Sequence, residues 1–231
     1  GMMLESGNDA ARAIAEHISG SESAFAELMN QKAATLGMTG TKFTKANGLH
    51  NEDHYTTAYD MALLTRYAMR NDTFRKIVST KTYNAAPTNR DSDGYQWQNT
   101  NKLIHTKAGE TSYEYLYATG VKTGDTNYAG RCLAASAKKN GVELILILFG
   151  DEGSNTRFQS AAKLFDWGFE NYMTLDVATL GLENTLEAAV ANADASDAEN
   201  GLLTLTIDFT GATISALRST IEAIQQDPSL L

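Results

Sequence analysis

The sequence contains one cysteine and two prolines, and it has no excess of basic residues. Cys132 alone excludes an internal disulfide and leaves a cysteine-rich metal site without ligands. The two prolines exclude a proline-rich linker. A formal net charge of −9 argues against nucleic acid as a partner. The longest apolar run, Leu144–Phe149, has only the length of a strand, so we expect no membrane span in this chain.

The chain has enough hydrophobic residues, at 42%, to bury a core. Its charge is distributed unevenly, because residues 171–231 contain nine acidic residues and a single basic residue, Arg218. This shift predicts a boundary near Asn171–Asp176. We therefore expect a first domain over residues 1–172, followed by an acidic C-terminal appendage over residues 173–231 that forms part of a second domain.

Local signals in the first part predict helices that begin at recognisable caps. Ser21 is a typical N-cap for an amphipathic helix that Gly37 closes. Thr57 with Asp60 resembles a capping box, and it predicts a helix through about Arg70.

The segments that follow predict strands and then a closing helix. An Asn140-Gly141 pair separates the apolar runs Cys132–Ala137 and Val142–Phe149, which predicts a β-hairpin. A helical pattern begins at about Thr156. Helices, then hairpin-linked strands, then a helix indicate an α+β fold.

Three patterns describe the acidic C-terminal region. Leu202–Phe209 alternates apolar and polar residues and predicts a strand, whereas Ser215–Gln226 has helical spacing of its apolar residues. Asn192–Asn200 is rich in small and polar residues and predicts a loop.

Two three-residue motifs are candidates for chemistry. Ser6-Gly7-Asn8 precedes a helical stretch, and Lys122-Thr123-Gly124 follows an aromatic-rich stretch. Alone, the first would be a helix cap and the second an ordinary strand end. Together and in this order, they match the Ser-x-Asn and Lys-Thr-Gly motifs of penicillin-binding proteins and β-lactamases. We therefore expect the two motifs to meet at one site shaped for the C-terminal end of a peptide.

Further segments fit the same pattern: Phe25–Asn30, Leu36–Met38, Asn47–Leu49, Thr57–Ala62, Asn99–Leu103, Lys122–Thr126, Arg157 and Trp167–Phe169. With the two motifs, they resemble the low-molecular-mass D-alanyl-D-alanine carboxypeptidases of the S11 peptidase type over roughly residues 4–172. The resemblance implies a β-lactamase/transpeptidase-like α+β fold, with helices around an antiparallel sheet. It also implies a serine-type reaction, in which an acyl-enzyme forms on a peptidoglycan stem peptide ending in D-Ala-D-Ala and is then hydrolysed.

The resemblance assigns catalytic roles to three residues. Lys122 would supply positive charge next to the leaving group, and Ser6 Oγ would pass a proton between a lysine and the departing amine. The side-chain amide of Asn8 would donate to the substrate carbonyl.

Four residues would bind the substrate. Thr123 and Arg157 suit its terminal carboxylate. Gly124, without a Cβ, would let the substrate backbone approach the strand. The backbone N–H of Asp125 would be one donor of the oxyanion hole. The resemblance implies no cofactor, and the four histidines lack metal-ligand spacing, so we expect no metal.

One departure from the family is large. The family's nucleophile lies in a Ser-x-x-Lys motif tens of residues before Ser-x-Asn, whereas only five residues precede Ser6. We therefore expect a chain that lacks its N-terminal segment and is inactive, while the full-length protein would bind β-lactams. Residues Ser136–Lys139 also match the Ser-x-x-Lys pattern. This segment runs from a predicted strand into a turn, where a nucleophile is not expected.

The resemblance places the parent protein outside the cytoplasmic membrane, in the cell wall or periplasm, with a signal peptide that is not present in this chain. Two alternatives stay open. One is a non-catalytic remnant that binds wall peptide or a protein partner, and the other is a β-lactamase relative.

Overall fold

The structure is a computed structural model that describes residues 1–182, 185–189, 202–206 and 208–231. It divides into two compact units. The first unit comprises residues 1–139 and 143–168, and the second comprises residues 140–142 and 169–231. None of the helices described is long and apolar enough to cross a membrane.

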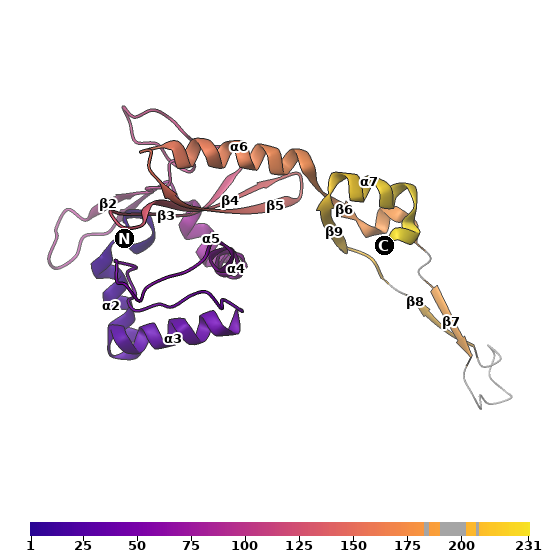
Figure 1. Cartoon of the computed structure of the whole chain (residues 1–231), viewed down its shortest axis with the longest axis horizontal. Coiled ribbons are helices and arrows are strands. Elements are labelled where there is room, and N and C mark those ends of the chain that lie inside the picture. The colour runs from indigo at the N-terminus through magenta and orange to yellow at the C-terminus, as the bar shows by residue number, and fades with distance from the viewer. Residues whose placement is uncertain (183–184, 190–201, 207) are drawn as a thin grey trace. The chain divides into compact units, whose positions relative to one another are not determined.

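The first unit begins with five helices, labelled in Figure 1: α1 Met2–Glu5, α2 Asn8–Ser19, α3 Glu22–Thr35, α4 Ala58–Ala68 and α5 Asp72–Ser79. The predicted caps at Ser21 and Thr57 are confirmed, because their hydroxyls accept hydrogen bonds from the N–H groups of Ala24 and Asp60. Each of these bonds satisfies a backbone donor that the first turn of a helix leaves free.

Two antiparallel sheets follow in the first unit. A hairpin pairs β1 (Thr82–Ala85) with β2 (Tyr95–Gln98). The larger sheet has the order β3-β4-β5, with bounds Ala118–Thr126, Gly130–Lys139 and Val142–Asp151.

The predicted hairpin is confirmed at the β4–β5 connection. Asn140 (φ 49°) and Gly141 (φ 82°) both adopt positive φ, as a two-residue hairpin turn requires. The sequence located this turn because only a few residue types adopt that backbone conformation without strain.

Helices cover both faces of the larger sheet (Figure 1). α6 (Thr156–Asn171) lies along one face, where Phe158 and Phe165 are almost fully buried. A Cβ on Gly168 would lie 2.5 Å from Leu144 Cδ1, so the glycine permits the close approach of helix and sheet. On the other face, Met69, Val78 and Val121 form a buried cluster that joins the helices to β3.

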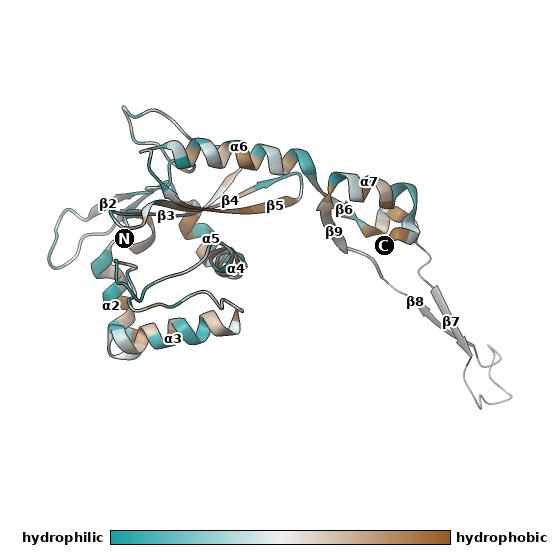
Figure 2. Cartoon of the chain, viewed as in Figure 1, coloured by the Kyte–Doolittle hydropathy of each residue, from teal (hydrophilic) through white to brown (hydrophobic). Residues whose placement is uncertain are grey.

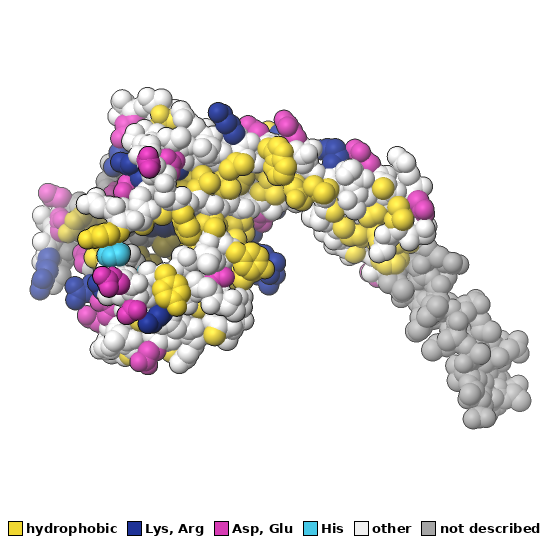
Figure 3. Space-filling model, viewed as in Figure 1, with side chains coloured by type: hydrophobic (Ala, Val, Ile, Leu, Met, Phe, Trp, Pro, Cys, Tyr) yellow, Lys and Arg dark blue, Asp and Glu magenta, His cyan; other side chains and the backbone are white. Residues whose placement is uncertain are grey.

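Strand β5 is apolar on both faces, which Figure 2 shows as hydrophobic colouring along its length. Such a strand is typical of the interior of a sheet. Among the described residues, however, β5 pairs only with β4, and its central side chains are only half-buried. In the space-filling view, hydrophobic side chains form a band above a hollow in the molecular surface (Figure 3).

The second unit combines short strands with one helix. β6 (Tyr172–Asp176) pairs with β9 (Thr213–Leu217), and β7 (Thr185–Ala189) pairs with β8 (Leu202–Thr206). A 3₁₀ turn (Val177–Leu180) follows β6, and α7 (Arg218–Gln226) and a second 3₁₀ turn (Pro228–Leu230) follow β9. Its core contains Leu175, Ile221 and Ile224.

Two predictions for this unit need correction. The helix predicted over Ser215–Gln226 begins only at Arg218, because residues 215–217 pair with β6 as the end of β9. The strand predicted over Leu202–Phe209 ends at Thr206. The loop predicted over Asn192–Asn200 lies outside the described residues.

Candidate active site

The two motifs meet through Ser6 and Lys122. Ser6 follows α1 in a left-handed conformation (φ 57°), and Lys122 lies in the middle of β3. The Lys122 ammonium donates a hydrogen bond to Ser6 Oγ and a second one, of 2.8 Å, to the carbonyl of Thr123. Residues 116 positions apart in the sequence therefore form one polar group.

Lys122 is electrostatically perturbed. Burial of its ammonium group, and secondarily the positive charge of Arg157, lower the pKa of Lys122 to about 8. A lysine with such a pKa exchanges its proton near neutral pH, as a general acid or base must.

The Thr123 side chain is held by a residue that we did not predict from the sequence. Thr123 Oγ1 lies 2.7 Å from Thr100 Oγ1. Thr100 is flanked by Asn99 and Asn101, both buried, and Asn99 Nδ2 donates to the carbonyls of Val78 and Thr80. The sequence indicated that Asn99 and Asn101 fix a loop near the site but gave them no specific role, and the structure shows that this segment holds Thr100 beside Thr123.

Arg157 lies against the backbone of β3. The residue is 8% exposed, and its Nη1 donates to the carbonyls of Gly124 (3.0 Å) and Cys132 (3.3 Å). Its Nε is buried and has no partner within the described structure. A buried N–H that lacks an acceptor is costly, so Arg157 Nε is an unsatisfied donor beside β3.

The remaining predicted residues are more exposed. Asn8 is the first residue of α2, and Gly7, not Ser6 or Asn8, occupies the N-cap without a side-chain bond. The interpretation of this motif as a simple helix cap is therefore wrong. The Asp125 side chain, 57% exposed, forms an ion pair of 3.4 Å with Arg131. A Cβ at Gly124 would approach no atom closer than 3.5 Å, so the fold itself does not demand a glycine there.

Two Ser-x-x-Lys sequences occur within the described helices and strands. Ser136 is fully buried on β4 and hydrogen-bonded to Thr119 Oγ1 at 2.7 Å. The second sequence, Ser160 to Lys163, escaped the sequence analysis, and it lies inside α6 rather than at the start of a helix. The hydrogen bonds of Lys122 go to Ser6 and the Thr123 carbonyl, not to either of these serines.

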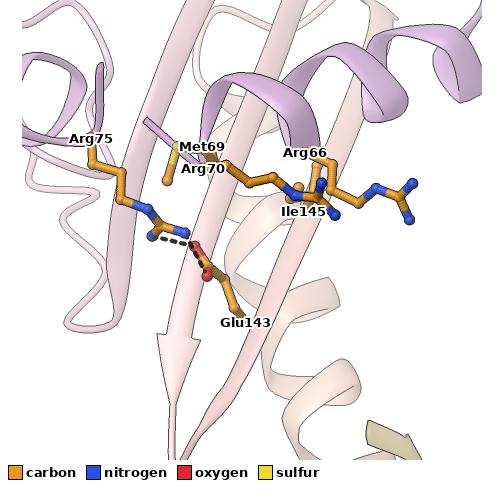
Figure 4. Close-up of a pocket in the computed structure, with 6 residues that line it drawn as sticks. All are labelled: Arg66, Met69, Arg70, Arg75, Glu143 and Ile145. Atoms are coloured by element: carbon orange, nitrogen blue, oxygen red, sulfur yellow. Dashed lines mark hydrogen bonds and ion pairs between the residues drawn. The ribbon is translucent and has the colours of Figure 1, made fainter. Parts of the chain in front are cut away.

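A separate pocket of about 380 Å³ lies between α4, α5 and β5 (Figure 4). Arg66, Met69, Arg70, Arg75, Glu143 and Ile145 line it. Arg75 and Glu143 form a bidentate ion pair with distances of 2.6 and 2.8 Å. The pocket shares no residue with the group around Lys122.

Comparison with known proteins identifies relatives of this chain. The model of the D-alanyl-D-alanine carboxypeptidase family, Peptidase S11, matches residues 1–153. D-alanyl-D-alanine carboxypeptidase DacF of Bacillus subtilis is 38% identical over 174 residues, which cover 75% of this chain and 42% of that protein. DacD of Escherichia coli is 33% identical over 184 residues, which cover 78% and 43%. The chain thus spans less than half the length of these relatives.

Solved structures of two such proteins superpose on this chain. Penicillin-binding protein 5 of Haemophilus influenzae superposes with a TM-score of 0.73 at 29% identity, covering 96% of this chain and 59% of that one. The Streptomyces K15 DD-transpeptidase superposes with a TM-score of 0.66 at 33% identity, covering 74% and 65%.

Proposed function

The chain belongs to the D-alanyl-D-alanine carboxypeptidase family of S11 peptidases, and we propose that it supplies the Ser-x-Asn and Lys-Thr-Gly parts of a serine-type active site for peptides ending in D-Ala-D-Ala. Its fold is the β-lactamase/transpeptidase-like fold of the penicillin-binding DD-peptidases. The observation that carries the proposal is the hydrogen bond between Lys122 and Ser6, beside Thr123 and Arg157.

The substrate binds as an additional strand along the free edge of β3. Among the described residues, β3 pairs only with β4, so its other edge can accept an extended peptide. The terminal carboxylate binds Thr123 and the guanidinium of Arg157. The scissile carbonyl then reaches the N–H of Asp125, and no Cβ at position 124 hinders the approach.

Lys122 and Ser6 serve proton transfer. When a serine hydroxyl attacks the scissile carbonyl, the C–N bond breaks, and the departing D-alanine amine needs a proton. Ser6 Oγ, which accepts a hydrogen bond from Lys122, passes a proton from the Lys122 ammonium to the amine, and the proton released by the attacking hydroxyl restores the charge of Lys122. Water then hydrolyses the serine ester. Because peptidoglycan lies outside the cytoplasmic membrane, this function places the protein in the cell wall or periplasm.

Ser6, the serine beside Lys122, is assigned to proton relay, so the attacking serine must be another residue. Ser136 is buried and Ser160 lies inside α6, so neither suits the role. The polypeptide of 231 residues, taken by itself, therefore binds the peptide without turning it over. Binding without turnover is also what the second candidate function, a non-catalytic module for wall peptides, predicts for this chain. Activity measurements on longer forms of the protein distinguish the carboxypeptidase from the non-catalytic module.

An NMR titration tests the proposal on the 231-residue chain. Acetyl-Gly-D-Ala-D-Ala should shift the backbone amide resonances of Lys122–Asp125, and the same peptide ending in L-Ala-L-Ala should shift them much less. The variant Thr123→Val, which keeps the size of the side chain but removes its hydroxyl, should weaken the binding. If the D-peptide leaves these resonances unchanged, the proposal is wrong.

A further inference from the structure

Three aromatic rings share one face of the β1–β2 hairpin. Tyr83 of β1 lies directly opposite Trp97 of β2, and Tyr95 lies two residues before Trp97, on the same face. The ring centroids of Tyr83 and Trp97 are 5.8 Å apart, and those of Tyr95 and Trp97 are 6.2 Å apart. Both interplanar angles are small, 15° and 13°, so the three rings are nearly parallel. We call these three side chains the aromatic face.

The rings of the aromatic face are open to solvent. Tyr83 is 55% exposed, Tyr95 is 50% exposed and Trp97 is half-buried. A cross-strand aromatic pair stabilises a hairpin, which explains Tyr83 with Trp97. It does not explain Tyr95, because Tyr95 lies opposite Ala85 and adds no cross-strand aromatic pair. The third ring therefore indicates a role beyond the stability of the hairpin.

Contacts at both ends of β2 fix the aromatic face. Asp91 forms a hydrogen bond with the Tyr95 hydroxyl and thereby raises the pKa of Tyr95. At the other end of the strand, the Gln98 N–H donates to Glu5 Oε1 at 2.6 Å. Because the rings already have their positions, a ligand that stacks on them loses little of its binding free energy to ordering the protein.

The composition of the hairpin restricts the chemistry of such a ligand. Thr82–Ala85 and Tyr95–Gln98 include no charged side chain, and the loop between them contains one arginine and two aspartates. Nucleic-acid bases also stack on exposed rings, but their backbone requires a positively charged groove. A neutral ligand with flat apolar faces and polar edges fits better. A pyranose sugar has this form, because C–H bonds cover its faces and hydroxyl groups surround it.

We propose that the aromatic face binds a neutral, unbranched chain of β-linked N-acetylated pyranoses, the chemistry of a cell-wall glycan strand. β-Linkages keep such a chain extended, so that successive sugars can lie on neighbouring rings. The identification of the ligand as wall glycan rests on the proposed function, whereas the binding of the oligosaccharide itself does not.

The position of the hairpin suits a glycan whose attached peptide enters the candidate active site. Trp97 lies three residues before Thr100, whose hydroxyl is 2.7 Å from Thr123 Oγ1. Three residues of chain span at most roughly 10 Å, and a stem peptide of about five residues spans up to roughly 17 Å. A stem attached to a sugar at Trp97 is therefore long enough to reach Thr123.

An NMR titration of the 231-residue chain with tetra-N-acetylchitotetraose tests the aromatic face. We expect the sugar to shift the indole N–H resonance of Trp97 and the backbone amides of Tyr95–Gln98. Tyr83→Ala and Tyr95→Ala should each weaken binding about threefold to tenfold, the range typical of one aromatic contact. Tyr95→Phe, which keeps the ring, should bind like the parent. Maltotetraose, whose α-linkages curl the chain, should bind more weakly.

Two further variants separate recognition from folding. Tyr59→Ala is the matched control, because Tyr59 is also an exposed tyrosine of the first unit, at 72%, and it should bind like the parent. Tyr95→Leu keeps an apolar side chain without a flat ring, and it should lose as much affinity as Tyr95→Ala. Unchanged hydrogen exchange of the Gln98 N–H in Tyr95→Leu would show that the hairpin is intact.

Three results would overturn the proposal: no shift at Trp97 on addition of the sugar, parent-like binding by Tyr95→Leu, or a dimer of the chain that dissociates in Tyr95→Ala. The last would make a second copy the occupant of the aromatic face. None of these results affects the proposed function, which the peptide titration of Lys122–Asp125 tests separately. Conversely, if the sugar binds and the peptide does not, the aromatic face stands and the proposed function fails.

Discussion

Lys122 and Ser6 are hydrogen-bonded although 116 positions separate them in the sequence. The contact depends on α1, which is tied to the middle of the chain. Glu5 Oε1 accepts a hydrogen bond of 2.6 Å from the Gln98 N–H, and the Leu4 carbonyl accepts one of 3.2 Å from the Thr100 N–H. The same short segment, residues 98–100, thus positions Ser6 through α1 and Thr123 through the Thr100 hydroxyl.

The first prediction concerns the charge of Lys122. Because its pKa is about 8 in the folded state, against an ordinary value of 10.5, the unfolded state binds more protons between these two pH values. Below pH 8 both states are protonated, and the folded state bears the full cost of burying the charge. The parent should therefore gain about 2 kcal/mol in unfolding free energy, relative to Lys122→Met, from pH 7 to pH 9.5.

Urea denaturation of parent and variant at the two pH values measures this difference. Lys138→Met, which removes an exposed lysine of β4, is the control for the loss of one positive charge. A difference between parent and Lys122→Met that stays constant with pH would contradict the perturbed titration of Lys122.

The second prediction concerns Asp60, which is 3% exposed. Its Oδ2 accepts hydrogen bonds from the Gly40 N–H (2.9 Å) and the Thr41 hydroxyl (2.6 Å). Asp60→Ala leaves the Gly40 N–H without its acceptor and should cost about 1–3 kcal/mol of unfolding free energy. Asp60→Asn retains an acceptor oxygen and should cost less. Thermal and chemical unfolding measure both, and equal losses would show that the carboxylate oxygen does not hold the Gly40–Thr41 segment.

These bonds also show what the sequence could reveal about Asp60. The Thr57–Asp60 spacing predicted a capping box, and the Thr57 hydroxyl does accept from the Asp60 N–H at 3.1 Å. The aspartate side chain, however, points to a partner twenty residues earlier instead of back to Thr57. A helix cap can be predicted from the sequence because its partners are neighbours in the chain, whereas a hydrogen bond across a loop cannot.

The same distinction between local and long-range contacts explains which other predictions from the sequence were confirmed and which were wrong. The Asn140-Gly141 turn was predictable because its backbone conformation favours these two residue types. The start of α7 was not, because the pairing of β9 with β6 overrides the local helical spacing of Ser215–Leu217. Likewise, the sequence motifs pointed to Thr123 but not to Thr100, because the contact between these two threonines forms only after β3 has folded against the segment that contains Thr100.

The third prediction concerns the pocket beside β5. Arg75 and Glu143 join α5 to β5 with two hydrogen bonds, and their side chains are 34% and 27% exposed. A double-mutant cycle with Arg75→Ala and Glu143→Ala should give a coupling of about 1 kcal/mol, modest because water still reaches the pair.

Arg66 lines the same pocket and has no ion-pair partner within the described residues, so Arg66→Ala is the matched control. It should change stability by less than about 0.5 kcal/mol. A coupling near zero in the cycle would mean that the bidentate geometry does not bind α5 to the sheet.

The last prediction concerns covalent chemistry. Acylation by penicillin requires a serine that is activated by a neighbouring base and accessible to the drug. Ser6 is exposed and accepts a hydrogen bond from Lys122, but the proposed function assigns it to proton relay. Ser136 fails on access because it is fully buried, and Ser160 lies mid-helix. The purified 231-residue chain should therefore show no covalent band after incubation with a fluorescent penicillin, whereas an active penicillin-binding protein labels under the same conditions. If a band does appear, the variants Ser6→Ala, Ser136→Ala and Ser160→Ala identify the serine, and loss of the band in one of them would refute the assignment of that serine as a residue that is not the nucleophile.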